Sequence, residues 1–83
     1  MIIRTVPINA FFETETAALL VQTASGYKSR LSLQLDNKTA SAKSIMGVIS
    51  LALAEGDNLT ITAEGADETE ALAALEGFVK AQL

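Results

Sequence analysis

Residues 31–48 read LSLQLDNKTASAKSIMGV, and this stretch decides the fold. Its first five residues alternate strictly between apolar and polar side chains, which is typical of a β-strand with one buried face. Asp36-Asn37 is a turn signal, and residues 38–42 predict a short polar strand that returns antiparallel to the first. Ser44 stands just before an apolar run, so it predicts the N-cap of a short helix. The stretch therefore predicts a β-hairpin that leads directly into a helix.

Two further strands are predicted on either side of this stretch. Residues 2–8 are rich in β-branched side chains and predict a strand. Pro7 cannot donate a hydrogen bond to a neighbouring strand, so this strand is expected to lie at a sheet edge or to end near Pro7. Residues 59–63 alternate again between apolar and polar and predict a strand with one buried face.

Two further helices are predicted from apolar residues that recur at intervals of three and four. The first helix begins near Thr14, its candidate N-cap, and ends at Gly26, its candidate left-handed residue. The last helix follows Asp67, with acidic residues near its start and Lys80 near its end, as the helix dipole favours. The predicted buried stripes are Ala17, Leu20, Val21 and Ala24 in the first helix, and Leu72, Leu75 and Val79, with Phe78 beside them, in the last.

The predicted element order is β-α-β-β-α-β-α. Each strand has one apolar face, and three helices are available to cover it. This pattern predicts an α+β fold, an open-faced sandwich in which three helices lie on one face of a four-stranded antiparallel sheet. A chain of 83 residues is expected to form a single domain, residues 1–83.

Composition excludes several classes of function. The chain has no cysteine and no histidine, so disulfides and a zinc site are not expected. It has six basic and ten acidic residues and a net charge of −4, which argues against binding to nucleic acid. The apolar start of the chain is too short for a signal peptide or a membrane span. A soluble, cytoplasmic protein without a cofactor is therefore expected.

Three segments carry a resemblance to a known family: residues 20–25 (LVQTAS), 43–48 (KSIMGV) and 64–72 (EGADETEAL). They resemble the histidine-containing phosphocarrier (HPr) family of bacterial sugar-uptake systems. Residues 43–48 are similar to the regulatory serine segment of its Gram-positive members. The resemblance runs without a gap from about Ala17 to near the C-terminus, and it implies a sheet of strand order 1-4-2-3.

The chain departs from the family before Ala17. Carriers in the family read Gly-x-His-x-Arg-Pro where this chain reads FFETET. Glu13 thus stands at the histidine position, Glu15 at the arginine position and Thr16 at the proline position. The carrier histidine takes up a phosphoryl group, and a carboxylate would repel it. The chain is therefore expected to be neither a phosphocarrier nor an enzyme. Crh-type members also lack the histidine, but they keep the arginine and the proline.

Ser44 has two interpretations. As a plain N-cap, its hydroxyl accepts a hydrogen bond from a backbone N–H group, which stabilises the helix by about 1 kcal/mol. The resemblance implies, in addition, phosphorylation by an HPr kinase/phosphorylase. The phosphorylated form would then act as a corepressor of a carbon-catabolite transcription regulator. A phosphate suits a helix start, where free N–H groups and the positive end of the dipole meet it.

Six residues are candidates for a partner-binding surface. Three of them, in the first helix, lie off its apolar stripe. In the next helix, Val48 and Leu51 are better candidates for the core than Met46. An exposed methionine suits adaptable contacts. The alternative for all six is core packing. The chain itself is expected to be a monomer or a weak dimer. The six candidates are Ala18, Leu19, Gln22, Ile45, Met46 and Ile49.

The acidic pair Glu13 and Glu15 leaves several interpretations open. The dipole of the following helix favours acidic residues at its start, which is the strongest of them. The others are acid–base chemistry, a divalent cation held by two carboxylates, and imitation of a phosphorylated histidine by Glu13. Phe12 is expected to pack. Phe11 either covers this region or contacts a partner.

Overall fold

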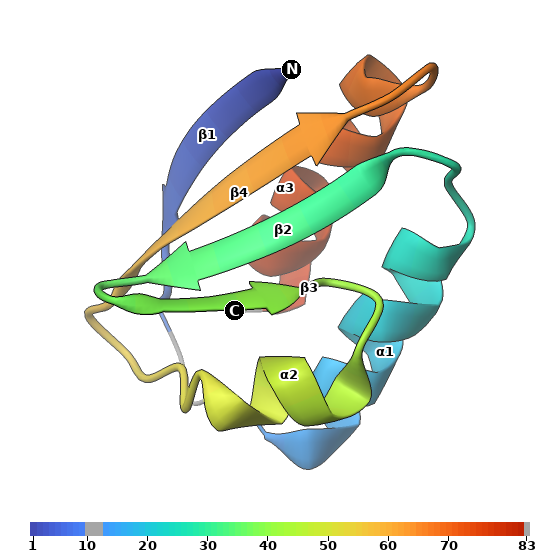
Figure 1. Cartoon of the computed structure of the whole chain (residues 1–83). Coiled ribbons are helices and arrows are strands. Elements are labelled where there is room, and N and C mark those ends of the chain that lie inside the picture. Colours follow the sequence, from blue (N-terminus) through green and yellow to red (C-terminus); the bar gives the residue numbers. More distant parts are fainter. Residues whose placement is uncertain (10–12, 83) are drawn as a thin grey trace.

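A single antiparallel sheet with helices on one face makes up the architecture (Figure 1). The computed structural model describes residues 1–9 and 13–82. Within these residues the strands are β1 (Ile2–Pro7), β2 (Arg30–Leu35), β3 (Lys38–Ser41) and β4 (Asn58–Glu64), in the order β1-β4-β2-β3. The helices are α1 (Thr14–Ser25), α2 (Ile45–Ser50) and α3 (Glu68–Gln82). The predicted element order and strand order are confirmed.

The hairpin predicted from residues 31–42 is present. β2 and β3 pair antiparallel, with Leu35 opposite Lys38 across the turn. Asp36 adopts a left-handed backbone with φ of 54°, which aspartate tolerates better than most residues. β1 pairs with β4, and Pro7 lies at the end of this edge strand, where a missing N–H costs least.

The core lies between the helices and one face of the sheet. The apolar residues of the alternating strands point inward, so Leu31, Leu33 and Ile61 are fully buried. The opposite face carries hydroxyl and amide side chains, and two of its hydroxyls, those of Thr5 and Thr60, lie 3.2 Å apart. The sheet therefore has one buried and one polar face, as the alternation predicts.

The predicted start and end of α1 are confirmed, but the predictions for its N-cap residue and for the conformation of Gly26 were wrong. Glu13, not Thr14, occupies the cap position with an extended backbone, and its side chain makes no capping hydrogen bond. Thr14 is already helical, which removes its hydroxyl from the capping geometry. Gly26 is not left-handed but has φ of −75°. The helix ends instead in a tight turn, in which Gly26 N–H donates to the Thr23 carbonyl and Tyr27 N–H to that of Ala24.

A left-handed residue does follow α2. Ala52 has φ of 52°, and its N–H donates to the Ile49 carbonyl over 3.0 Å. This closes a six-residue helix and turns the chain toward β4. Leu51, predicted to lie in the helix, is its C-cap and is buried.

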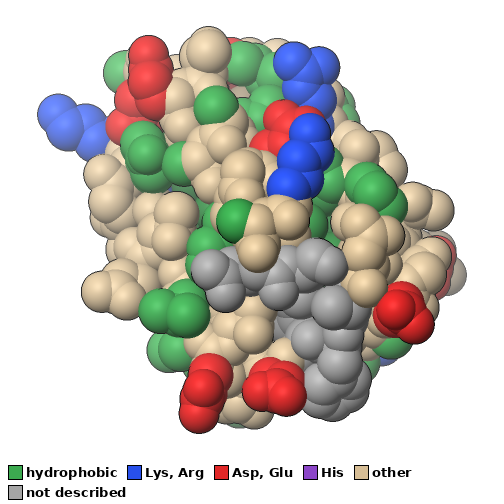
Figure 2. Space-filling view, turned by 180° about the vertical axis from the view of Figure 1, so that it is seen from behind, with side chains coloured by type: hydrophobic (Ala, Val, Ile, Leu, Met, Phe, Trp, Pro, Cys, Tyr) green, Lys and Arg blue, Asp and Glu red, His purple; other side chains and the backbone are tan. Residues whose placement is uncertain are grey.

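Charged side chains of both signs are interspersed on the face seen in Figure 2, without a continuous basic area. This agrees with the scattered acidic and basic residues of the sequence. None of the helices in residues 1–9 and 13–82 is long and apolar enough to span a membrane.

Candidate protein-binding site

Helices α1 and α2 pack against each other and expose an apolar surface to solvent. The exposed fractions are 46% for Leu19, 44% for Ile45, 72% for Met46 and 39% for Ile49. Val48, in the same short helix, is fully buried. Ala18 and Gln22 of α1 are also exposed. The structure thus places all six candidate residues outside the core, and we call them the α1/α2 surface.

Ser44 caps α2 at the edge of this surface. Its backbone is extended, and its Oγ accepts a hydrogen bond of 3.1 Å from Gly47 N–H. The predicted cap is confirmed. The space around Gly47 is tight, because a Cβ there would lie 3.1 Å from the Ala40 side chain and 3.2 Å from Ser44 Oγ. Ser44 is half-buried and directly precedes the exposed Ile45 and Met46.

Lys43 fixes the approach to this cap, a role that its position in the sequence does not reveal. Its Nζ donates a hydrogen bond of 2.7 Å to the Tyr27 carbonyl, just beyond the end of α1. Its backbone N–H donates to Ser41 Oγ. The start of α2 is therefore tied to the end of α1.

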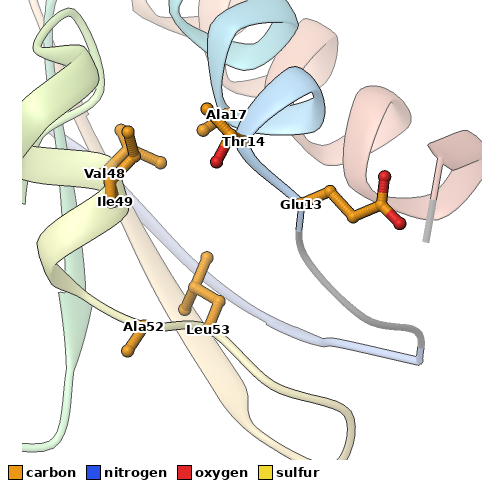
Figure 3. Close-up of a pocket in the computed structure, with 7 residues that line it drawn as sticks. All are labelled: Glu13, Thr14, Ala17, Val48, Ile49, Ala52 and Leu53. Atoms are coloured by element: carbon orange, nitrogen blue, oxygen red, sulfur yellow. The ribbon is translucent and has the colours of Figure 1, made fainter.

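A small pocket of about 50 Å³ lies between the start of α1 and the end of α2 (Figure 3). Ala17, Val48 and Leu53 are buried and form its apolar base. Thr14, Ile49 and Ala52 complete the wall together with Glu13, whose carboxylate extends away from the base in Figure 3. Periodicity in the sequence gives no signal for this pocket, because it forms only when the two helices pack.

Glu13 and Glu15 are both exposed at the start of α1, and of the two only Glu13 lines this pocket. Among the residues that the structure describes, neither carboxylate takes part in an ion pair. Within the same residues no group of three or more potential metal ligands is found. The predictions for Phe11 and Phe12 lie outside the described residues.

A cluster of hydrogen bonds around Asp67 lies just before the start of α3. The Asp67 carboxylate accepts hydrogen bonds from the Ser29 hydroxyl and from the backbone N–H groups of Ser29 and Lys28, the latter two at 2.9 Å. The Ser29 hydroxyl above all, and then the Lys28 N–H, lower the Asp67 pKa from 3.8 to about 2. The cluster joins the loop before β2 to the start of α3, so it is structural.

This cluster predicts acid sensitivity. The folded-state pKa of Asp67 lies below its ordinary value, so its hydrogen bonds stabilise the fold above about pH 4, and this stabilisation is lost as the pH falls toward about 2. In urea titrations between those pH values, Asp67→Asn should therefore lose stability less steeply than the parent chain. Glu64→Gln, at an exposed carboxylate, is the control and should keep the parent slope. An unchanged slope in Asp67→Asn would contradict the assignment.

The sheet order and the helices on one face define an open-faced α/β sandwich of the phosphocarrier type. A family model described as "PTS HPr component phosphorylation site" matches residues 5–81. The chain belongs to the HPr family and is similar to its Crh-type members.

Two relatives are both described as "HPr-like protein Crh". That of Halalkalibacterium halodurans is 40% identical over 75 residues, which cover 90% of this chain and 89% of the relative. That of Bacillus subtilis is 42% identical over 71 residues, which cover 86% of this chain and 84% of the relative.

Two solved structures bear out the fold. HPr-C-His from Thermoanaerobacter tengcongensis matches with a TM-score of 0.92 and 39% identity, over 99% of this chain and 94% of that protein. Crh of Bacillus subtilis, a catabolite-repression protein described as a dimer with a swapping domain, matches with a TM-score of 0.80 and 40% identity. That match covers 94% of this chain and 90% of that protein.

Proposed function

We propose that this chain is an HPr-like regulatory protein of carbon catabolite repression. In this proposal an HPr kinase/phosphorylase phosphorylates Ser44. The phosphorylated chain then binds a carbon-catabolite transcription regulator as a corepressor, through the α1/α2 surface. The chain does not carry phosphate on histidine and catalyses no reaction of its own. The similarity to Crh-type proteins supports the regulatory role.

The observation that carries the proposal is the place of Ser44. Its hydroxyl lies at the start of α2 and at the edge of an exposed apolar surface. A phosphate there adds a charge of about −1.5 to −2, which a basic partner surface can recognise.

The α1/α2 surface supports a protein partner rather than a small substrate. Its four large apolar side chains are well exposed, and the pocket beside them is small. Exposed apolar clusters of this kind mark sites of protein–protein contact. The dimer described for Bacillus subtilis Crh supports weak self-association as a further property of the chain.

The kinase experiment tests the switch. Incubation with an HPr kinase/phosphorylase and ATP should add one phosphate, located at Ser44 by mass spectrometry. Ser44→Ala should abolish this phosphorylation while the fold is retained by circular dichroism. Ser50→Ala, a serine at the end of the same helix, is the control and should be phosphorylated normally. Phosphate at Ser41 or Ser50 in the parent chain would rule out the assignment.

A second candidate function is an unregulated protein-binding module in which Ser44 only caps α2. The hydrogen bond from Gly47 N–H to Ser44 Oγ favours it, because this bond alone explains a serine at the position. The same kinase experiment separates the two functions: a chain that the kinase leaves unmodified would support the module.

The absence of histidine predicts that the phosphocarrier reaction fails. The sequence contains no imidazole to accept a phosphoryl group, and the resemblance places Glu13 at the position of the family histidine. Incubation with phosphoenolpyruvate and the general enzyme of the sugar-transport system should leave the chain unlabelled. A histidine-containing HPr in the same reaction is the positive control. Stoichiometric acid-labile phosphate on this chain would overturn the prediction.

A further inference from the structure

Lys43 connects the segment that carries Ser44 to the end of α1. Its Nζ donates a hydrogen bond of 2.7 Å to the Tyr27 carbonyl, and this bond is partly shielded from solvent. A hydrogen bond from an ammonium is charge-assisted and is stronger than one between neutral groups. The apolar stem of a lysine can pack along its neighbours while the ammonium reaches its acceptor. Lys43 therefore fixes residues 41–44 on the side that faces α1.

The acceptor of this bond belongs to a peptide unit that is held at its other end. The Tyr27 carbonyl and the Lys28 N–H are parts of one planar peptide unit. That N–H donates a hydrogen bond of 2.9 Å to Asp67 Oδ2. Because the unit is planar, a bond that fixes its N–H also fixes the direction of its carbonyl, and each bond polarises the unit in favour of the other. The Asp67 carboxylate, this peptide unit and the Lys43 ammonium thus form one continuous chain of hydrogen bonds.

The segment before Ser44 is also fixed on the side of the sheet. Ala42 is fully buried, and its N–H donates to the Leu31 carbonyl over 2.8 Å. The Ser44 N–H donates to the Ser41 carbonyl over 3.1 Å. Removal of the Lys43 ammonium would loosen the opposite side of the segment. Ser44 would then keep its cap conformation for a smaller fraction of the time.

We propose that Lys43 positions Ser44 for phosphorylation, supported by Asp67 through the peptide unit that they share. The inference rests on the proposed phosphorylation of Ser44, and it adds the residues that control it. A kinase binds the conformation that presents the serine. When this conformation is populated only in part, the apparent affinity decreases in proportion, whereas the bound chain reacts at its usual rate. Loss of the Lys43 ammonium should therefore raise KM and leave kcat unchanged.

The kinetics of phosphorylation test the role of Lys43. Lys43→Met removes the ammonium and keeps an unbranched apolar stem, so KM of the chain for an HPr kinase/phosphorylase should rise roughly 5-fold at unchanged kcat. Lys43→Arg keeps a cationic donor and should restore most of the lost efficiency. Lys38→Met, at an exposed lysine of β3, is the control and should keep the parent KM. An unchanged KM in Lys43→Met would overturn the inference.

Amide hydrogen exchange in the free chain separates positioning from a direct contact between Lys43 and the kinase. In Lys43→Met, the Gly47 N–H that completes the cap should exchange roughly 5-fold faster, while the slow amides of β4 keep their parent rates. Lys43→Arg should return the Gly47 rate toward that of the parent chain. A raised KM with parent exchange at Gly47 would show that the lysine contacts the kinase instead, and the inference would be wrong.

A double-mutant cycle with Asp67→Asn tests the support through the shared peptide unit. Asparagine keeps an oxygen acceptor but lacks the charge, so it should hold the Lys28 N–H less firmly. The rise in KM caused by Lys43→Met should be smaller in the Asp67→Asn background, because both substitutions act through the same unit. Equal rises in the two backgrounds would overturn the role of Asp67.

Failure of the proposed function and failure of this inference give different results. A parent chain that the kinase leaves unmodified would refute the proposed phosphorylation of Ser44, and the inference with it. A parent chain phosphorylated at Ser44, with the same KM and the same Gly47 exchange in Lys43→Met, would refute the inference alone.

Discussion

Met46→Ala is expected to weaken binding of the regulator to the phosphorylated chain by about 2 kcal/mol, which is roughly 30-fold in Kd. Met46 is 72% exposed, so the substitution removes contact area from the partner and not from the core. Leu19→Ala, on the neighbouring helix, should have a similar effect. Isothermal titration calorimetry measures both, and circular dichroism verifies that the fold is unchanged.

Two control variants make this result specific. Ile3→Ala removes an aliphatic side chain that is 56% exposed on the edge strand β1, so it should leave binding unchanged. Glu13→Gln should have a smaller effect than Met46→Ala, because a charge at the rim contributes less affinity than an apolar anchor. If Glu13→Gln abolished binding while Met46→Ala bound normally, the binding surface would lie at the start of α1, and imitation of a phosphorylated histidine would become the better account.

The fold could be predicted from the sequence because its determinants are local and periodic. Strict alternation in residues 31–35 and 59–63 specifies strands with one buried face, and the structure buries the apolar set. Apolar residues at intervals of three and four specify the helix stripes in the same way. Ser44 before an apolar run was sufficient to predict the cap that Gly47 N–H completes.

The positions where α1 begins and ends could be predicted, but its capping geometry could not, because several local solutions compete there. A glycine after a helix suggests a left-handed residue, but a tight final turn satisfies the same carbonyls with Gly26 in a right-handed conformation. A left-handed residue occurs instead after α2, at Ala52. The preference for glycine at such positions does not identify it. Propensity alone does not decide between these arrangements.

The candidate site was predicted in part. Exposure of Leu19 and Met46 follows from their positions off the apolar stripes, and the structure bears it out. The pocket and the hydrogen bond from Lys43 to Tyr27 depend on how α1 and α2 pack against each other. No sequence pattern within either helix therefore predicts them. The cluster around Asp67 joins Asp67 to Lys28 and Ser29, which precede it by 39 and 38 positions in the sequence. Local sequence patterns could not predict it either.

Gly65→Ala is expected to be the most destabilising of the substitutions considered, by about 3 kcal/mol or more. Gly65 begins the turn from β4 to α3 with φ of 151°, a conformation that residues with a side chain rarely adopt. A Cβ there would also lie 2.7 Å from the backbone Cα of Ser29, which cannot move aside while Asp67 holds it. For a domain whose total stability is typically of order 5 kcal/mol, the loss should show as a large fall in the urea midpoint.

Gly77→Ala is the matched control, because it makes the same chemical change at a glycine inside α3 where a Cβ meets no atom within 4 Å. Helix propensity predicts that this variant gains about 0.5 to 1 kcal/mol. The two alanine variants should therefore move the midpoint in opposite directions. A Gly65→Ala variant as stable as the parent would show that the loop before β2 can move away from the start of α3. The Asp67 cluster would then not be what fixes the two together.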